Sequence, residues 1–189
     1  MLEVSFTPFP VLTTERLILR EITHDDAGEM FRYRSDKKIM QFIHRPLMTS
    51  PEEAIPYIDK INNNHRNNEG IMWAITLKGE GKLIGTVGFW RMEKEHHRAE
   101  IGYMLGGNYH GKGIMQEALQ TMIKFGFENI KLHSAEAHVN PVNISSVKVL
   151  ERAKLRREAH FKENFCFNGV FRDTYVYCML ASDYFKNEP

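Results

Sequence analysis

Hydrophobic positions recur with the two-residue period of β-strands in the first and middle parts of the chain. Leu17, Leu19 and, less regularly, Ile22 nearly alternate with other residues in the charged segment 15–22, which predicts a half-buried first strand. Apolar runs at 73–77, 83–90 and 98–105 are joined by short polar connections, the first of them rich in glycine. Short connections favour antiparallel neighbours, so these runs predict a three-stranded meander.

Helical spacing separates the predicted strands. One helix is expected to begin near Thr23, and a second near Ser50, which would be its N-cap, with Pro51 as the first helical residue and Glu53 closing a capping box. A long amphipathic helix is expected after Gly113, because apolar residues recur there at three- and four-residue intervals. They are Ile114, Met115, Ala118, Leu119, Met122, Ile123 and Phe127.

The last third of the chain continues the mixed pattern. We expect a strand at 132–139, a helix at 143–153 and two strands at 158–167 and 171–180. The order β-α-α-β-β-β-α-β-α-β-β contains no repeat and no linker, which predicts one α/β domain over 1–189. Its sheet would be mixed but mostly antiparallel, with about seven strands and about four helices.

Composition excludes several classes of protein. Lys and Arg total 25 against 24 for Asp and Glu, so no basic surface for nucleic acid or anionic membrane is indicated. The two cysteines, Cys166 and Cys178, have neither metal-site nor disulfide-framework spacing, and we expect both to be buried and reduced. Nine histidines form no HxH or HExxH motif, so no metal is expected. With no signal peptide and no apolar run near the roughly 20 residues of a membrane span, we expect a cytoplasmic protein.

The glycine-rich segment from Gly106 to Gly113 joins a predicted strand to the long helix. Unpaired N–H groups and the positive end of the helix dipole favour an anion at such a junction. Gly111 and Gly113 lack the side chains that would keep a phosphate away from the backbone. The segment is therefore a candidate phosphate site, although a simple chain turn would also explain its glycines.

A nucleotide P-loop is a further alternative for this segment. Gly106, Gly111 and Lys112 satisfy most of that pattern. Gly113, however, stands where a Ser or Thr hydroxyl would hold Mg²⁺, and the strands upstream are predicted to be antiparallel rather than parallel. Both differences disfavour a P-loop.

Three motifs instead resemble the GNAT superfamily of acetyltransferases. Its pyrophosphate loop has the pattern Gln/Arg-x-x-Gly-x-Gly/Ala, which residues 108–113 match except for Asn108 at the first position. Glu117-Ala118 after the loop, the segment 12–20 and the segment 143–151 resemble the RimJ/RimL-like branch, which acetylates protein N-termini. The resemblance covers nearly the whole chain in order. It implies acetyl-CoA as co-substrate.

The resemblance also assigns positions along the bound acetyl-CoA. Backbone amides would hold the pyrophosphate at His110, Gly111, Lys112, Gly113, Ile114 and Met115. Lys112 could add a point charge or simply be solvated. The strand 98–105 would splay from 132–139 so that pantetheine pairs with its free edge, and an N–H near Met104 or Leu105 would bind the thioester oxygen. Asn143, the expected N-cap of a helix, would contact pantetheine, with Ser146 near the sulfur.

The acid and base are less clearly marked. Glu100, flanked by Ala99 and Ile101, is our candidate base, although a structural ion pair with Arg91 or Arg98 would also explain a glutamate here. Tyr103 is a weaker candidate, as a hydrogen-bond donor or a packing residue.

Two positions depart from the family pattern. Many members protonate the leaving thiolate with a tyrosine where this chain has Leu150, and no replacement acid is evident. The proton could come directly from the product ammonium or from water, or Ser146 could stabilise the thiolate instead. Lys154 replaces a usual glycine after the same helix, at a cost of about 1 kcal/mol if it is left-handed.

The implied reaction is transfer of acetyl from acetyl-CoA to a primary amine by direct attack in a ternary complex. An α-amino group, with a pKa near 8 against about 10.4 for lysine, needs less help to become neutral, which favours a protein N-terminus as acceptor. Small amines such as an antibiotic or polyamine, and a non-catalytic acyl-CoA-binding module, are the alternatives. The acceptor groove would involve helices over 25–34 and 51–64, together with Glu100 and Trp90. A homodimer would fit this branch.

Overall fold

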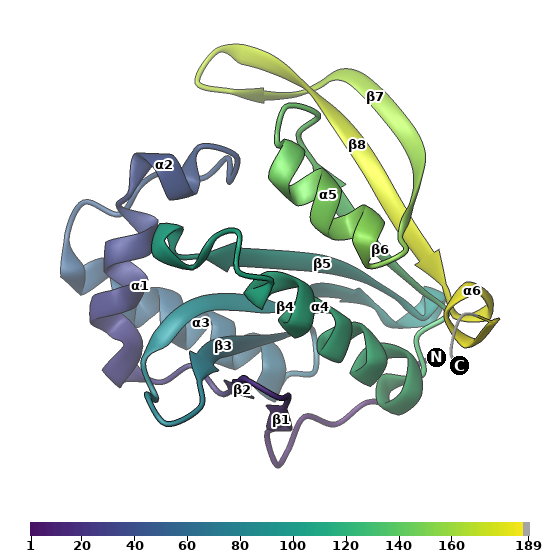
Figure 1. Ribbon diagram of the computed structural model, residues 1–189, viewed down its shortest axis with the longest axis horizontal. Helices are drawn as coiled ribbons and strands as arrows, with labels where there is room; N and C mark the ends of the chain where they lie inside the picture. The colour runs from purple at the N-terminus through teal and green to yellow at the C-terminus, as the bar shows by residue number, and fades with distance from the viewer. Residues whose placement is uncertain (187–189) are drawn as a thin grey trace.

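The structure, a computed structural model, describes residues 1–186, so the end of the predicted domain, 187–189, lies outside the described residues. It is a single-domain α/β fold built on one open sheet of eight strands (Figure 1). The strands are β1 Leu12–Thr13, β2 Leu17–Arg20, β3 Ile71–Leu77, β4 Leu83–Glu93, β5 Arg98–Leu105, β6 Ser134–Val139, β7 Arg156–Phe167 and β8 Val170–Leu180. The α-helices are α1 Ala27–Arg34, α2 Lys37–Met40, α3 Ala54–Arg66, α4 Ile114–Phe125, α5 Ile144–Arg152 and α6 Ala181–Lys186.

The sheet order is β1-β2-β3-β4-β5-β6-β8-β7, and every pair except β5 with β6 is antiparallel. This confirms the mixed, mostly antiparallel sheet. The parallel pair is short, because Arg98–Glu100 pair with Ser134–Glu136 and no pairing follows. β5 nevertheless continues to Leu105 and β6 to Val139. The two strands therefore separate beyond Glu100, as the family resemblance implied.

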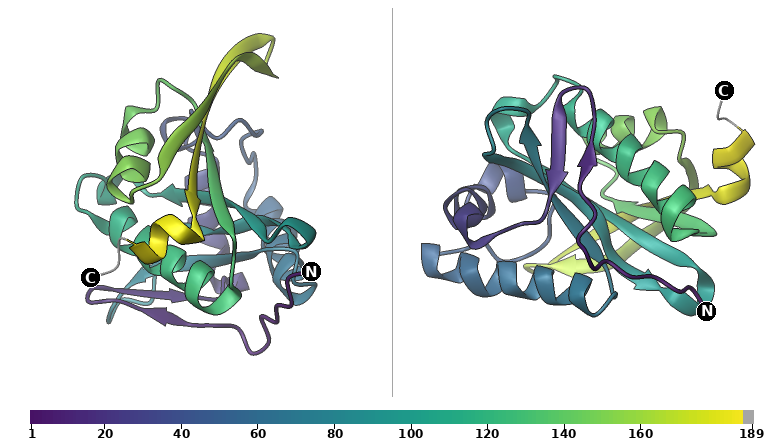
Figure 2. Two further views of the ribbon diagram at one scale, coloured as in Figure 1. Left: turned by 90° about the vertical axis from the view of Figure 1, so that its right-hand side faces the viewer. Right: turned by 90° about the horizontal axis from the view of Figure 1, so that it is seen from below.

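Helices cover the two faces of this sheet and enclose two hydrophobic clusters (Figure 2). On one face, α4 packs its apolar residues against side chains such as Trp73 and Ile101. On the other face, α1 and α3 pack against Met104 and its neighbours. Successive residues of a strand alternate between these faces, so β5 presents Glu100 and Met104 to the α1–α3 side and Tyr103 to the α4–α5 side.

Several elements differ from the prediction. The additional strand β1 is only two residues long, too short to show alternation. The short helices α2 and α6 likewise have no amphipathic period to detect. β6 begins two residues later than expected, because a single π-helical turn, Gly126–Ile130, precedes it. Lys131 ends that turn with a φ of 64°, and the Leu132 N–H donates to the Gly126 carbonyl, so neither residue belongs to the strand. The core of each longer element was predicted correctly.

The predicted capping box at Ser50 was wrong. The Glu53 carboxylate accepts from the N–H and the hydroxyl of Thr49, one residue earlier. The first turn, Pro51–Glu53, is a tight 3-10 turn, and α3 begins only at Ala54. Ser50 is nevertheless the N-cap of this turn and Pro51 its first residue, as predicted.

Burial corrects one expectation about the cysteines and confirms the helix ending. Cys178 is buried, which raises the pKa of its thiol to about 11, whereas Cys166 on β7 is exposed because that strand lies in a projecting hairpin. Lys154 has a φ of 68°, so it does adopt the left-handed conformation after α5. Within residues 1–186 the structure has no helix with the length and apolar character to cross a bilayer.

Candidate active site

The glycine loop has a backbone conformation that favours glycine. Gly111 and Gly113 both have a φ of 74°, in the left-handed region where a side chain costs about 1–2 kcal/mol. Gly113 is also the N-cap of α4. The two glycines thus shape the loop as well as leaving its backbone accessible.

The loop presents free hydrogen-bond donors at the start of α4. In the described part of the chain, no hydrogen bond is made by the amides of Gly111, Lys112, Gly113, Ile114 and Met115. They lie at the positive end of a helix of 12 residues. A phosphate group fits this donor set, because each oxygen can accept from more than one backbone N–H.

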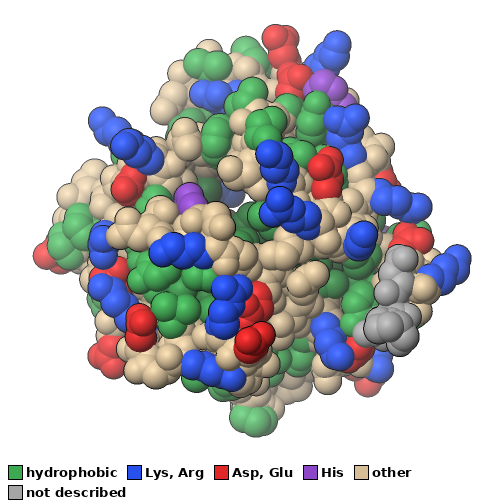
Figure 3. Space-filling model, viewed as in Figure 1, with side chains coloured by type: hydrophobic (Ala, Val, Ile, Leu, Met, Phe, Trp, Pro, Cys, Tyr) green, Lys and Arg blue, Asp and Glu red, His purple; other side chains and the backbone are tan. Residues whose placement is uncertain are grey.

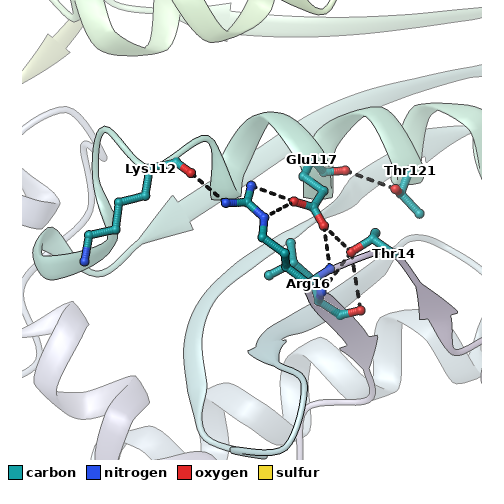
Figure 4. Close-up of polar contacts among 6 residues, drawn as sticks. Thr14, Arg16, Lys112, Glu117 and Thr121 are labelled. Carbon is teal, nitrogen blue, oxygen red and sulfur yellow. Dashed lines mark hydrogen bonds and ion pairs between the residues drawn. The ribbon is translucent and has the colours of Figure 1, made fainter.

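His110 differs from the other predicted members of this set. Its N–H donates to the Gly107 carbonyl at 3.2 Å, and its ring Nε2 lies 2.9 Å from the Leu105 carbonyl oxygen. The N–H therefore closes a turn within the loop, and the ring holds the loop against the end of β5. The Lys112 ammonium lies 5.9 Å from the centre of the Tyr109 ring, and its side chain extends away from Glu117 (Figure 4).

A polar network ties this loop to the N-terminal strands (Figure 4). The Glu117 carboxylate on α4 accepts from the Arg16 Nε at 2.6 Å, from the Arg16 N–H at 3.0 Å and from the Thr14 hydroxyl. The same Arg16 side chain donates to the Lys112 carbonyl at 3.0 Å. The motifs around 12–20 and Glu117 are thus one unit that fixes the loop, a role that no periodicity in the sequence indicated.

This network predicts a pH-dependent contribution to stability. Burial raises the pKa of Glu117, but the hydrogen bonds from Thr14 and Arg16 outweigh it and hold the pKa below its ordinary value. Its stabilisation is therefore present at neutral pH and lost as the pH falls through that lowered pKa. We expect Glu117→Gln to lower the free energy of unfolding at pH 7 by about 1 kcal/mol, because solvent around Arg16 screens the pair.

Thermal unfolding of both proteins between pH 7 and pH 3 measures this effect. The difference in Tm should be constant near neutrality and shrink below about pH 4. Glu80→Gln, in the exposed turn between β3 and β4, should leave Tm unchanged. Equal Tm values for the Glu117→Gln and Glu80→Gln proteins at pH 7 would contradict the bracing role.

Where β5 leaves β6, its backbone has a free edge. The Gly106 N–H donates to the Ile84 carbonyl, and Met104 is paired with Thr86. Because N–H directions alternate along a strand, Leu105 directs its N–H away from β4 and toward the opening. Of the two positions predicted to donate to a thioester oxygen, the geometry favours Leu105. The molecular surface is hollowed in this region, between α2 and α5 (Figure 3).

A pair of hydroxyl groups spans this opening. The Tyr103 Oη on β5 lies 2.5 Å from the Ser146 Oγ on α5. Asn143 is the N-cap of α5, as predicted, and its side-chain oxygen accepts from the Ser146 N–H at 3.2 Å. Burial raises the pKa of Tyr103 to about 12, so its phenol stays protonated at neutral pH. Sequence reasoning named these residues separately but did not pair Tyr103 with Ser146.

The opposite face of β5 carries a carboxylate beside an aromatic residue. The side chain of Glu100 is 12% exposed, and its carboxylate lies 3.1 Å from the Arg91 guanidinium, one of its two expected ion-pair partners. Trp90 is the extra residue of a bulge in β4 and packs over Gly102, where an added Cβ would lie 3.0 Å from the indole. Bulges re-aim side chains and are frequent beside active sites.

Two further potential ligand groups lie near Glu100. Its carboxylate, that of Glu136 and the His138 ring offer atoms within 4.8 Å of one another. Arginines neutralise the two acids, with Arg91 at 3.1 Å from Glu100 and Arg98 at 3.7 Å from Glu136. The guanidinium groups of Arg91 and Arg98 thus provide the positive charge that a metal ion would otherwise provide beside these carboxylates.

Comparison with known proteins agrees with this geometry. Residues 16–156 match the acetyltransferase (GNAT) domain family. An uncharacterized N-acetyltransferase, p20 of Bacillus licheniformis, is 34% identical over 92% of this chain and 97% of its own. The [ribosomal protein uS5]-alanine N-acetyltransferase of Escherichia coli is 25% identical over 92% of each chain. A GNAT-family acetyltransferase structure from Bacillus anthracis superposes with a TM-score of 0.82 at 29% identity, covering 92% of this chain and 99% of that one. The chain belongs to the GNAT superfamily and is an acetyl-CoA-dependent N-acetyltransferase.

Proposed function

We propose that this enzyme acetylates the α-amino group of a polypeptide N-terminus. The observation that carries the proposal is the arrangement around β5, with Glu100 on the α1–α3 face and the Tyr103–Ser146 pair on the other, where the sheet opens. An α-amino group needs only a single weak base to lose its proton near neutral pH. The relative in Escherichia coli is named for acting on an alanine of ribosomal protein uS5.

The residues of the loop fit the co-substrate. The free amides at 111–115 would hold the pyrophosphate, and the Leu105 N–H at the free edge of β5 would face the thioester oxygen. Asn143 and Ser146 would border the pantetheine from α5. Bound acetyl-CoA supplies an already activated acetyl group, so positioning and proton transfer are what remain for the protein.

Two groups of residues would handle the protons. Glu100 would accept the proton of the amine, and Arg91, 3.1 Å away, would hold its carboxylate in place. The protonated phenol of Tyr103 would donate through Ser146 to the departing sulfur. Leu150, at the usual tyrosine position, is fully buried in the core, and its side chain can neither donate nor accept a proton.

Removing the phenol tests its role. We expect Tyr103→Phe to lower kcat by about 10- to 100-fold while the KM for acetyl-CoA stays unchanged, since only proton donation is lost. Ser146→Ala should have a similar effect if the two hydroxyls act in series. Tyr109→Phe is the matched control, because its hydroxyl makes no hydrogen bond within residues 1–186. Steady-state kinetics measure both constants, and an unchanged kcat in Tyr103→Phe would contradict this role.

An acceptor panel tests the proposed substrate class. Peptides with free N-termini, the same peptides with blocked N-termini and an internal lysine, spermidine and an aminoglycoside are each incubated with acetyl-CoA. Free thiol is measured, and mass spectrometry locates the acetyl group. We expect turnover on free α-amino groups. Turnover confined to the small amines would instead support the alternative acceptor class.

The number of subunits does not enter the proposed reaction. The homodimer that the family resemblance suggests stays a prediction. Light scattering of the purified protein measures it directly. A monomer at micromolar concentration would rule out a stable dimer without affecting the proposed reaction.

A further inference from the structure

A cavity of about 330 Å³ lies between the segment that follows α2 and the tip of the β7–β8 hairpin. In Figure 1 the hairpin bends over the molecule toward α2. Lys37 and Arg45 line the cavity from one side, and Arg172 and Phe167 line it from the hairpin. Segments more than a hundred residues apart in the sequence thus form one concave surface.

The cavity is strongly basic although the whole chain is nearly neutral. Its lining contains Lys37, Arg45 and Arg172 but no aspartate or glutamate. Within residues 1–186, none of the three takes part in an ion pair, and the Arg172 Nε is buried without a hydrogen-bond partner. The nearby Asp36 carboxylate is already used as the N-cap of α2, where it accepts from two backbone amides. Three cationic groups therefore line the cavity without an ion-pair partner in the described part of the chain.

An aromatic contact holds the two walls together. The ring of His44 packs against Phe165 at 5.0 Å and Phe167 at 5.6 Å between ring centres. Burial and the charges of Arg172 and Arg45 lower the pKa of His44, so the ring is neutral near pH 7. The imidazole acts as a packing group, and the positive charge of the cavity comes from the lysine and the two arginines.

The cavity borders the hydrophobic cluster that covers the acceptor face of the sheet. Met40 lines it and belongs to the same hydrophobic cluster as Met104 on β5. This is the face to which β5 presents Glu100. A chain whose α-amino group reached Glu100 could therefore extend toward the hairpin.

We infer that this cavity binds acidic side chains of the acceptor peptide, a few residues after the N-terminus that is acetylated. The inference rests on the proposed function. The three cations are spread over different segments with Met40 and Phe167 between them, which suits a peptide with both carboxylate and apolar side chains better than one compact anion. The same charges repel polyamines.

Matched peptides test the inference. Three share an N-terminal serine and continue with Glu and Asp, with Gln and Asn, or with Lys and Arg. We expect kcat/KM to be about tenfold or more higher for the acidic peptide than for its amide counterpart, and this preference to weaken as salt is added. In an Arg45→Gln/Arg172→Gln protein the two peptides should become equivalent. Arg172→Glu should favour the basic peptide.

Controls separate charge recognition from folding and from the reaction itself. Lys78→Gln, an exposed basic residue in the turn after β3, should keep the full preference. Calorimetry with CoA should give the same Kd for all variants, which shows that the fold and the loop are intact. Fluorescence anisotropy of labelled peptides with CoA present measures binding without turnover.

The outcomes are distinct. Acidic peptides that bind in an Arg172-dependent way but are not acetylated would support the inference and overturn the proposed function. Acetylation of all three peptides at equal rates, unchanged by the arginine variants, would overturn the inference alone. Arg172-dependent binding of inorganic phosphate or AMP, with no peptide preference, would also overturn it and assign the cavity to a small anion.

Discussion

Replacing Glu100 by glutamine is expected to lower kcat at pH 7 by about 100-fold. Glutamine is similar in size but cannot accept a proton, so the acceptor amine must lose its proton to water before it attacks. An α-amino group with a pKa near 8 is mostly neutral above about pH 9, and there the deficit of the variant should become smaller. Initial rates for a free N-terminal peptide between pH 6 and pH 9.5 measure the effect.

The neighbouring Glu93 provides the control. Its carboxylate lies 2.6 Å from Arg98 and 3.7 Å from Arg91, so Glu93→Gln disturbs the same arginines without removing the proposed base. We expect its kcat to stay within about twofold of the unchanged enzyme, as for a surface ion pair. A large loss in Glu93→Gln, or none in Glu100→Gln, would show that Glu100 only supports the local charge network.

The second large effect is expected in the glycine loop. We expect a Gly111→Ala/Gly113→Ala protein to bind CoA about 100-fold more weakly, because two residues at a φ of 74° would each be strained by about 1–2 kcal/mol. The substituted loop would relax, and its free amides would no longer converge on one phosphate. Calorimetry with CoA measures the change in Kd.

Two other glycines separate this effect from general destabilisation. Gly107 lies in the same segment, where an added Cβ meets no atom within 4 Å and the backbone is not left-handed. Gly107→Ala should therefore leave the Kd unchanged. Gly79, with a φ of 83° in the turn after β3, should lose stability on substitution by alanine while the Kd for CoA stays the same. Equal losses of affinity at Gly79 and in the double variant would refute a local role for the loop.

The sequence alone determined the main elements and indicated the glycine loop as the candidate co-substrate site. Period-two and helical patterns were long enough in β3, β4, β5 and α4 to define these elements, and short connections fixed their antiparallel order. The glycine loop was detectable because conformation and chemistry there depend on residues adjacent in the chain. The same holds for Asn143 as the N-cap of α5. Features that depend only on neighbouring residues, such as a glycine loop or an N-cap, can be predicted directly from the sequence.

Only the tertiary structure decided which distant residues meet. Glu117 and Arg16, 101 positions apart, form the network that fixes the loop, and Tyr103 and Ser146, 43 apart, form the hydroxyl pair. The basic cavity requires Arg45 and Arg172 on opposing walls. No periodicity encodes such contacts, because they depend on sheet order, on the separation of β5 from β6 and on the bend of the hairpin. The sequence therefore indicated the candidate acetyl-CoA loop and single acceptor-side residues such as Glu100, whereas their contacts with distant residues appeared only in the folded chain.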